Sequence, residues 1–375
     1  MSQDHPPERQ SHPNRRASCK CATSSAMDAA PCCQEERGRD GRIIGYPQEW
    51  SGEISHQEQA RLARDSNTDT LRGLKLPGLR IAGSFLGLVR FSHTLFALPF
   101  ALTAATLAWG RHGFSAVSLA GIVTCMVAAR CAAMAFNRLV DRDIDALNPR
   151  TAGRHLPAGL LSARAVCLFF LVSCLLFVCS AAIFLLADNP VPLIFAVPLL
   201  VFLCGYSLAK RFTVLAHFWL GVALGLSPLG AWIAIRGWET LWELPLPGLL
   251  GLAVMFWVAG FDILYATQDA DFDKKAGLHS VPAKLGIRGA LWVARACHVM
   301  MMGCLVPLCW LAGDLLGMPF QMALAGVGFL LLVEHALVRE DDLSRMNAAF
   351  FTVNAVLGIG LWLVVLEEVV RRTVV

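Results

Sequence analysis

From about residue 86 onward the chain alternates between long apolar runs and short polar, charged connections. Each run is about 20 residues long, the length at which an α-helix crosses a hydrocarbon core of about 30 Å. The pattern predicts about nine membrane-spanning helices, near residues 86–109, 115–140, 163–187, 190–209, 214–235, 246–267, 289–313, 317–337 and 346–367. We therefore expect an all-α, polytopic membrane protein.

Composition supports this prediction and distinguishes a polar N-terminal region from the apolar remainder of the chain. Of the 375 residues 56% are hydrophobic and only 16% are charged, whereas a soluble domain carries about 25% charged residues. Residues 1–80 are polar, have few large apolar side chains and show no periodicity, so we predict a disordered tail before a membrane domain at 84–370. The four cysteines of this tail fit no standard zinc spacing: Cys19, Cys21, Cys32 and Cys33.

Charge in the connections predicts the orientation. The positive-inside rule assigns loops rich in lysine and arginine to the cytoplasm. One set of alternate loops carries most of these residues, from Arg142 through Lys210 to Arg345, and the opposite set has little beyond Arg111 and Arg236. We expect the first set and the N-terminus to be cytoplasmic. The N-terminus lacks the features of a signal or transit peptide, which favours a bacterial inner (plasma) membrane.

Two acidic stretches each close an apolar run. "NRLVDRDIDALNPRTAGRHLPAG" follows the second predicted helix, and "FDILYATQDADFDKKAGLHSVPAKLG" follows the sixth. The chain crosses the membrane four times between them, and an even number of crossings returns it to the same face. We therefore expect the two stretches to lie together.

The polar residues of each stretch have helical spacing. Asn137, Asp141 and Asp145 lie at i, i+4 and i+8, which is nearly one face of an α-helix. The second stretch has acids at i, i+7 and i+11, and Arg130, Asn137 and Asp141 repeat that spacing. This repetition predicts two pseudo-repeated four-helix halves, each with one polar stripe, plus one helix.

Carboxylates on one helix face repel each other, and cations relieve that repulsion. Oxygen ligands without histidine or cysteine suit Mg²⁺, whose open positions are commonly filled by substrate phosphates. The predicted ligands are Asp141, Asp145, Asp269 and Asp273. The alternative is that these acids are solvated and simply paired with Arg142, Arg150 and Lys274.

Basic residues near the acids suit a phosphate. Arg150 and Arg154 follow the first stretch at i, i+4, and "GYSLAKRF" places Tyr206 and Lys210 at the same spacing. Arg130 lies about two turns inside the membrane, where a charge is costly and is a functional candidate. The alternative for Arg130 is a structural ion pair inside the bundle, for which Asp262 is a candidate partner.

Together, these motifs resemble the two aspartate-rich signatures of the UbiA superfamily of intramembrane prenyltransferases. The resemblance spans about residues 84–370, with both motifs in order and "YSLAKR" between them. It implies a nine-helix bundle that attaches a polyprenyl chain from a polyprenyl diphosphate to an aromatic acceptor.

The resemblance also implies roles for individual residues. By this resemblance, the four predicted ligand acids and Asn137 bind Mg²⁺ and diphosphate. The residues that match diphosphate-contacting positions of the family are Arg130, Arg150, Arg154, Tyr206 and Lys210. Asp262 matches an acid near the acceptor. One departure is Arg138, because many family members have aspartate there.

This departure, with "HTLFALPFA" and "GLHSVPAKLG", resembles the 4-hydroxybenzoate polyprenyltransferase branch of ubiquinone or menaquinone synthesis. A similar branch prenylates 1,4-dihydroxy-6-naphthoate in the futalosine route to menaquinone, so the acceptor stays open. A cation-coupled transporter is a distant alternative, but transporter sites lie near the midplane on broken helices. His217 and His298 are interpreted as structural, and His279 as a loop-capping residue.

Overall fold

The computed structural model describes residues 36–37, 43–45, 83–85, 87–89, 94–338 and 353–374. The chain divides into two compact units, Met1–Glu53 and Ile54–Val375. In the first unit, strands β1 (Glu36–Arg37) and β2 (Ile43–Gly45) pair in antiparallel fashion. The rest of that unit, including its cysteines, lies outside the described residues, so the predicted disorder of the tail stays a prediction.

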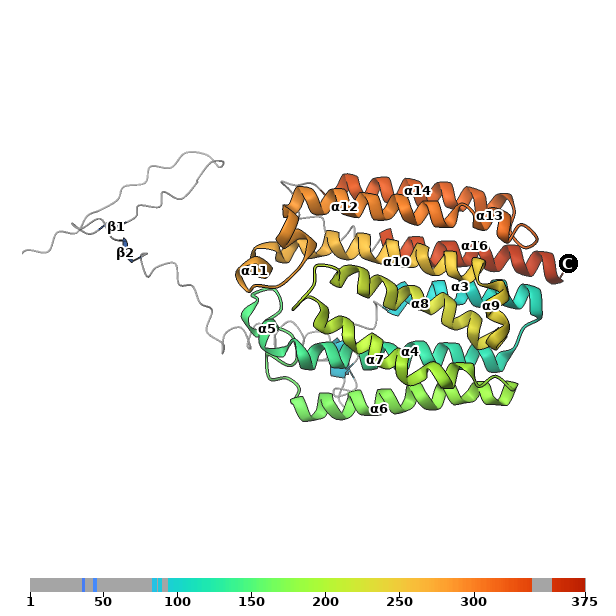
Figure 1. Ribbon diagram of the computed structural model, residues 1–375, viewed down its shortest axis with the longest axis horizontal. Coiled ribbons are helices and arrows are strands. Elements are labelled where there is room, and N and C mark those ends of the chain that lie inside the picture. Colours follow the sequence, from blue (N-terminus) through green and yellow to red (C-terminus); the bar gives the residue numbers. More distant parts are fainter. Residues whose placement is uncertain are drawn as a thin grey trace, which may run out of the picture. The chain divides into compact units, whose positions relative to one another are not determined.

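The second unit is a bundle of helices (Figure 1). Its α-helices are α3 (Thr94–His112), α4 (Ala116–Val140), α5 (Arg142–Leu147), α6 (Ala163–Ala182), α7 (Val191–Ala209), α8 (Ala216–Arg236), α9 (Thr240–Glu243), α10 (Pro245–Ala266), α11 (Ala270–Lys275), α12 (Val281–Leu305), α13 (Leu308–Leu311), α14 (Met318–Leu337) and α16 (Asn354–Val374). The 3₁₀ segments are η3 (Ile183–Ala187), η4 (Gly237–Glu239) and η5 (Thr267–Asp269). The predicted all-α class is confirmed.

Within the described residues, 7 helical segments are long and apolar enough to cross a membrane. They correspond to the predicted spans from 115–140 to 317–337. The first and last predicted spans correspond to α3 and α16, which are not among the seven. Helix α16 starts eight residues later than predicted and carries Arg371 and Arg372 in its last turn. The count of nine spans therefore stays a prediction.

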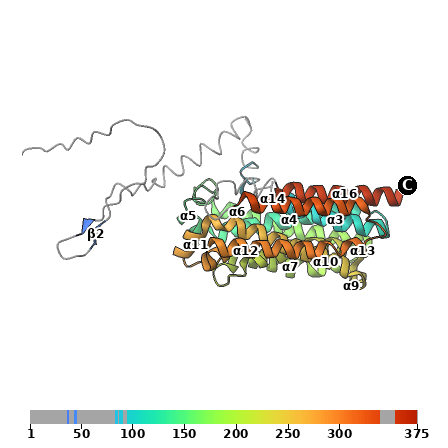
Figure 2. The same cartoon turned by 90° about the horizontal axis from the view of Figure 1, so that it is seen from above.

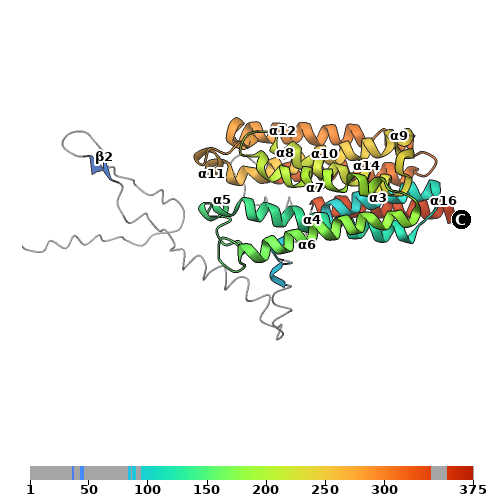
Figure 3. The ribbon, with the colours of Figure 1, turned by 60° about the horizontal axis from the view of Figure 1, so that its bottom comes forward.

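Helix packing brings the two acidic stretches to one end of the bundle. Helix α10 packs between α8 and α12, while α4 packs against α6 and α7, and α3 joins α8 to α16. Figures 2 and 3 show α5 and α11 together at the end of the bundle away from α9. The predicted common face of the two stretches is confirmed.

Glycines let α8 and α10 approach closely. A Cβ atom added to Gly221 would lie 2.5 Å from the Met255 carbonyl oxygen, and one added to Gly225 would lie 2.5 Å from that of Gly251. Cβ atoms do not approach backbone oxygens so closely, so only glycine fits. These glycines form the α8–α10 seam, which fixes α8 against α10, the helix that leads into the second acidic stretch.

Candidate active site

The first acidic stretch bends at Asp141. Helix α4 ends at Val140, α5 begins at Arg142, and Asp141 between them has φ −87° and ψ 5°. The helical spacing predicted for Asn137, Asp141 and Asp145 therefore extends over two helices. The hydrogen-bond ladder nevertheless continues, since the Asp141 N–H donates to the Asn137 carbonyl at 2.9 Å and the Asp145 N–H to the Asp141 carbonyl at 2.7 Å. The Asn137 amide also donates to Asp141 Oδ2 at 2.9 Å, so the predicted neighbours do meet.

The second acidic stretch is also not one helix. Helix α10 ends at Ala266, the 3₁₀ segment η5 ends at Asp269, and α11 follows. A 3₁₀ turn rotates about 120° per residue rather than 100°. The predicted face of Asp262, Asp269 and Asp273 is therefore broken after Asp262, and the last two acids are turned relative to it.

Asp269 joins the two stretches. Asn148 Nδ2 donates to its Oδ1 at 3.0 Å, and Arg150 Nε donates to the same oxygen at 2.8 Å. Another Arg150 N–H donates to Oδ2. Arg150 also lies over the Tyr265 ring, 5.2 Å from its centroid, and donates to the Tyr265 hydroxyl at 3.1 Å. Segments more than 100 positions apart thus share one charged cluster.

This contact keeps Arg150 charged. Burial alone lowers the pKa of the Arg150 guanidinium, but the hydrogen bonds and negative charge of Asp269 outweigh it and raise that pKa above its usual value. Arg150 is therefore a permanent cation at the junction. It can exchange one anionic partner for another without losing its proton.

Asp145 is buried among arginines. Arg154 Nη1 donates to both of its carboxylate oxygens at 2.7 Å, and Arg138 Nη1 lies 3.8 Å from Oδ2. Asp141, Asp145 and Asp273 are 3%, 4% and 7% exposed. The alternative of solvated acids is therefore wrong for these three acids.

Arginine pairing, the other part of that alternative, is confirmed only in part. Arg150 does pair with Asp269. Arg142, in contrast, lies 3.5 Å from the exposed Asp143 and not from a predicted ligand.

The turn that follows helix α7 contributes cations from a third direction. Lys210 Nζ lies 3.8 Å from Asp141 Oδ2, and Arg211 Nη2 lies 3.3 Å from Asp141 Oδ1. The His279 N–H donates to the Lys210 carbonyl at 2.7 Å, which ties the loop after α11 to the end of α7. The sequence reading missed Arg211 as a site residue, although it adjoins Lys210 in "YSLAKRF", and also missed Asn148.

Asp262 and Arg130 have different surroundings. Asp262 Oδ2 lies 2.7 Å from His217 Nδ1. Arg130 lines a cavity, as does Tyr206. The observed contact of Asp262 is thus with His217, and a structural ion pair of Arg130 inside the bundle stays an alternative.

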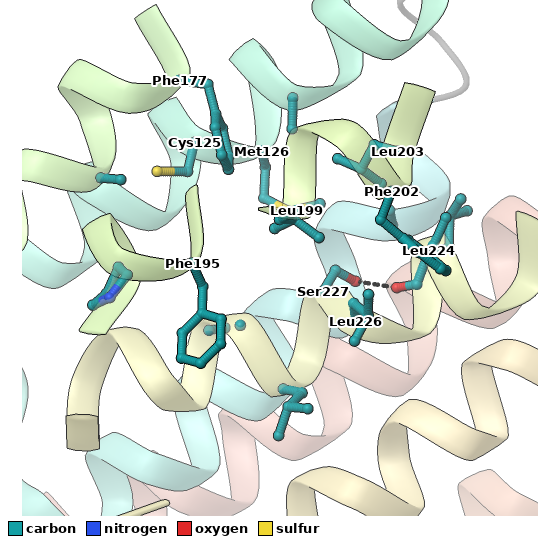
Figure 4. A pocket seen from close by; sticks show the side chains of 18 of the residues that line it. Cys125, Met126, Phe177, Phe195, Leu199, Phe202, Leu203, Leu224, Leu226 and Ser227 are labelled. Carbon is teal, nitrogen blue, oxygen red and sulfur yellow. Dashed lines mark hydrogen bonds between the residues drawn. The ribbon is translucent and has the colours of Figure 1, made fainter. Parts of the chain in front are cut away.

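That cavity has a volume of about 540 Å³ and lies among α4, α6, α7 and α8. Apart from Arg130, Tyr206 and Ser227, its lining is apolar. Figure 4 shows Phe177, Phe195, Phe202 and Leu224 facing it from several helices. Because Arg130 precedes Asn137 by two turns of α4 and Tyr206 precedes Lys210 by one turn of α7, the polar end of the cavity adjoins the charged cluster.

The charged cluster has the donor chemistry for a hard cation. Among the residues that the structure describes, no three His, Cys, Asp or Glu side chains already converge into a metal-binding group. The acids instead have arginines as partners. Their oxygens are the ligands that Mg²⁺ prefers, and the neighbouring cations can pair instead with an anion that accompanies a divalent ion.

Comparison with known proteins gives a consistent result. The model of the UbiA prenyltransferase family matches residues 97–356. The chain is 33% identical over 226 residues to a 4-hydroxybenzoate octaprenyltransferase of Nitrosomonas europaea, covering 59% of this chain and 72% of that protein. It is 28% identical over 314 residues to a polyprenyl transferase of Arthrobotrys oligospora, covering 77% and 80%.

Solved structures have the same fold. A UbiA homologue from Aeropyrum pernix K1 superposes with a TM-score of 0.63 at 30% identity, covering 74% of this chain and 97% of that one. A UbiA homologue from Archaeoglobus fulgidus, solved with DMAPP and Mg²⁺, has a TM-score of 0.58 at 20% identity, covering 76% and 99%. At that identity the second likeness shows the fold alone.

Proposed function

The chain belongs to the UbiA prenyltransferase family, and we propose that it transfers a polyprenyl chain from a polyprenyl diphosphate to an aromatic acceptor such as 4-hydroxybenzoate, in quinone synthesis. The relatives named for 4-hydroxybenzoate support this acceptor class. The reaction joins carbon 1 of the prenyl chain to a ring carbon. Diphosphate leaves with the electrons of the carbon–oxygen bond.

One observation carries the proposal: an apolar cavity in the bundle ends at a cluster of acids and cations. A polyprenyl diphosphate has this same division, with a long apolar chain and a compact anionic head. The chain fits the cavity among α4, α6, α7 and α8. The head fits the charged cluster beyond Arg130 and Tyr206.

The acids of the cluster would hold the metal. Asp141 and Asp145 from the first stretch, with Asp269 and Asp273 from the second, would provide carboxylate oxygens, and Asn137 would orient Asp141. A Mg²⁺ ion held by these residues would supply positive charge to offset the charge of the diphosphate leaving group.

The cations of the cluster would bind the diphosphate directly. Arg150, Arg154 and Lys210 all pair with acids here and are positioned to donate to phosphate oxygens instead. Charge-assisted hydrogen bonds of this kind stabilise charge that develops as the leaving group departs. Arg130 and Tyr206 would act where the chain meets its head.

Water must be kept from the allylic cation that forms when diphosphate leaves. The apolar lining of the cavity excludes it. On the acceptor side, Asp262 is the acid that would accept the proton released from the ring. Its side chain is 28% exposed, so it keeps a free face.

We further infer that the end of the bundle with α5 and α11 faces the cytoplasm. The positively charged loops at that end support this orientation. Soluble acceptors and diphosphates of the cell would then reach the charged cluster directly.

The test uses membranes that contain the folded protein, Mg²⁺ and farnesyl diphosphate. 4-Hydroxybenzoate and 1,4-dihydroxy-6-naphthoate are supplied separately, with EDTA and Asp269→Asn as controls. Product from one acceptor, lost in both controls, identifies the acceptor and supports the mechanism. No product from either acceptor would contradict the proposed acceptor class. Cation flux into vesicles that contain the protein would then favour the cation-coupled transporter.

A further inference from the structure

A buried histidine holds the acceptor-side carboxylate. His217 lies on the first turn of α8, is 6% exposed, and places Nδ1 2.7 Å from Asp262 Oδ2 on α10. From the sequence it was interpreted as structural, but its contact is with a proposed active-site acid. We propose that His217 is a positioning residue for prenyl transfer, which holds the Asp262 carboxylate by a hydrogen bond and aims it at a phenolic acceptor; this proposal rests on the proposed function.

The α8–α10 seam explains why the two side chains meet. His217, Gly221 and Gly225 occupy positions i, i+4 and i+8 on α8, so they share the face that packs on α10. Asp262 lies seven residues after Met255, which is on the matching face of α10. The close approach at the glycines thus delivers the imidazole to the carboxylate at the end of the seam.

The neighbours of the ring assign its proton. The Val281 N–H, at the first turn of α12, points to His217 Nε2 at 3.5 Å. This N–H is one of those that a helix start leaves without an intrahelical partner. With a donor facing Nε2, the ring proton belongs on Nδ1 and is donated to Asp262. His217 therefore acts as the hydrogen-bond donor to Asp262 and is not itself the base.

This donor fixes one oxygen of Asp262 and leaves the other available. Asp262 Oδ1 can then take the proton that the ring carbon loses after it bonds to carbon 1 of the prenyl chain. The electron pair of the broken C–H bond returns to the ring, and the resulting carboxylic acid later gives its proton to water.

His217 also connects the acceptor side to the loop after the second acidic stretch. Val281 follows that loop directly, and the Leu278 N–H within it donates to the Asp273 carbonyl at 2.8 Å. One imidazole thus contacts α10 through Asp262 and the start of α12 through Val281. The relative position of acceptor and diphosphate depends on both.

Two conservative substitutions separate these contacts. The amide nitrogen of asparagine reaches the place of Nδ1, whereas that of glutamine reaches the place of Nε2. We expect His217→Ala and His217→Gln to lower kcat with the acceptor by about ten- to hundredfold, the effect of losing a hydrogen bond to a charge. His217→Asn should recover most of the activity. In all three variants the KM for farnesyl diphosphate should stay within about twofold of wild type.

A matched control and a double variant exclude general damage. His298 on α12 is 3% exposed and packs against Gly260 of α10 on another side, so His298→Ala removes an equally buried imidazole away from Asp262. It should leave kcat unchanged in the folded fraction. Because His217 acts through Asp262, adding His217→Ala to Asp262→Asn should cause no further loss. Additive losses, or equal losses in the asparagine and glutamine variants, would overturn the proposal.

A measurement without turnover distinguishes failure of this proposal from failure of the proposed function. A hydrophobic carbodiimide modifies accessible carboxyl groups, and the contact with His217 covers one oxygen of Asp262. Mass spectrometry of the peptide with Asp262 gives the rate of modification. We expect His217→Ala to raise that rate about tenfold over wild type at neutral pH, and His217→Asn to restore the slow rate. Equal rates in wild type and His217→Ala would refute the role of His217 even if no acceptor is ever found. The expected difference in an inactive protein would refute only the acceptor class.

Discussion

Arg150 Nε lies 2.8 Å from Asp269 Oδ1, and a second N–H of the same guanidinium donates to the other carboxylate oxygen. The two residues belong to different acidic stretches, 119 positions apart. Two parallel hydrogen bonds of this kind need a planar, forked donor, which arginine has and lysine lacks. This pair therefore joins the two halves of the charged cluster.

The first prediction concerns that fork. Arg150→Lys keeps the charge but loses the second hydrogen bond and the stacking on Tyr265. We expect kcat/KM for the prenyl diphosphate to fall by about tenfold or more, which corresponds to about 1.4 kcal/mol. Steady-state kinetics with varied diphosphate measures it. Arg164→Lys, on the exposed first turn of α6, is the matched control and should change nothing. Equal kinetics for the two variants would show that the fork is not needed.

The second prediction concerns the buried acid Asp145. Asp145→Asn leaves Arg154 and Arg138 without their carboxylate, and breaking such a buried pair costs about 3 kcal/mol. The apparent unfolding temperature in detergent should fall, and adding Arg154→Gln should restore part of it. Asp143→Asn is the control, because the Asp143 side chain is 93% exposed. Similar unfolding temperatures for the Asp145 and Asp143 variants would contradict the assigned burial.

Much of this arrangement could be predicted from hydrophobic periodicity. Apolar runs of membrane length locate most of the helices, because the bilayer fixes how long such a helix must be. The parity of crossings correctly placed the two acidic stretches at one end. The positive charge of Arg150, Arg154 and Lys210 near the acidic stretches also predicted them as site residues, and all three contact the predicted acids.

Details that depend on backbone bends and on tertiary contacts could not be predicted. The bend at Asp141 and the 3₁₀ turn that ends at Asp269 interrupt the regular α-helical geometry. No proline or glycine at these positions predicts them. Arg211 and His217 gain their partners only through helix packing. Residue spacing within one segment predicts neither the backbone bends nor the contacts between helices.

The third prediction concerns the cavity. Ala234 lines it, 14 residues after Leu220 on α8 and so about 21 Å further from the charged cluster. Ala234→Phe should therefore reduce transfer from long donors such as octaprenyl diphosphate several-fold, while transfer from geranyl diphosphate is kept. Product ratios from donors of increasing length measure this. Val201→Phe is the control, because Val201 is 68% exposed and is not part of the lining. Equal losses for short and long donors would argue against a chain-binding cavity.

The fourth prediction concerns the α8–α10 seam. In Gly221→Ala the new Cβ atom would lie 2.5 Å from the Met255 carbonyl oxygen, so the helices must move apart. We expect a loss of about 1–3 kcal/mol in stability, the usual effect of overpacking. Because His217 lies one turn before Gly221, kcat with the acceptor should fall as well, even in protein that stays folded.

Gly326→Ala provides the comparison for that seam variant. Gly326 lies on α14 outside the cavity lining, a Cβ atom there has nothing within 4 Å, and alanine favours a helix over glycine by about 1 kcal/mol. We expect its unfolding temperature in detergent to equal or exceed that of wild type, with unchanged kcat. If Gly221→Ala unfolds at the same temperature as Gly326→Ala and keeps its kcat, close helix approach does not set the His217–Asp262 contact. If only Gly221→Ala loses both stability and kcat, the packing of α8 against α10 sets the position of the Asp262 carboxylate.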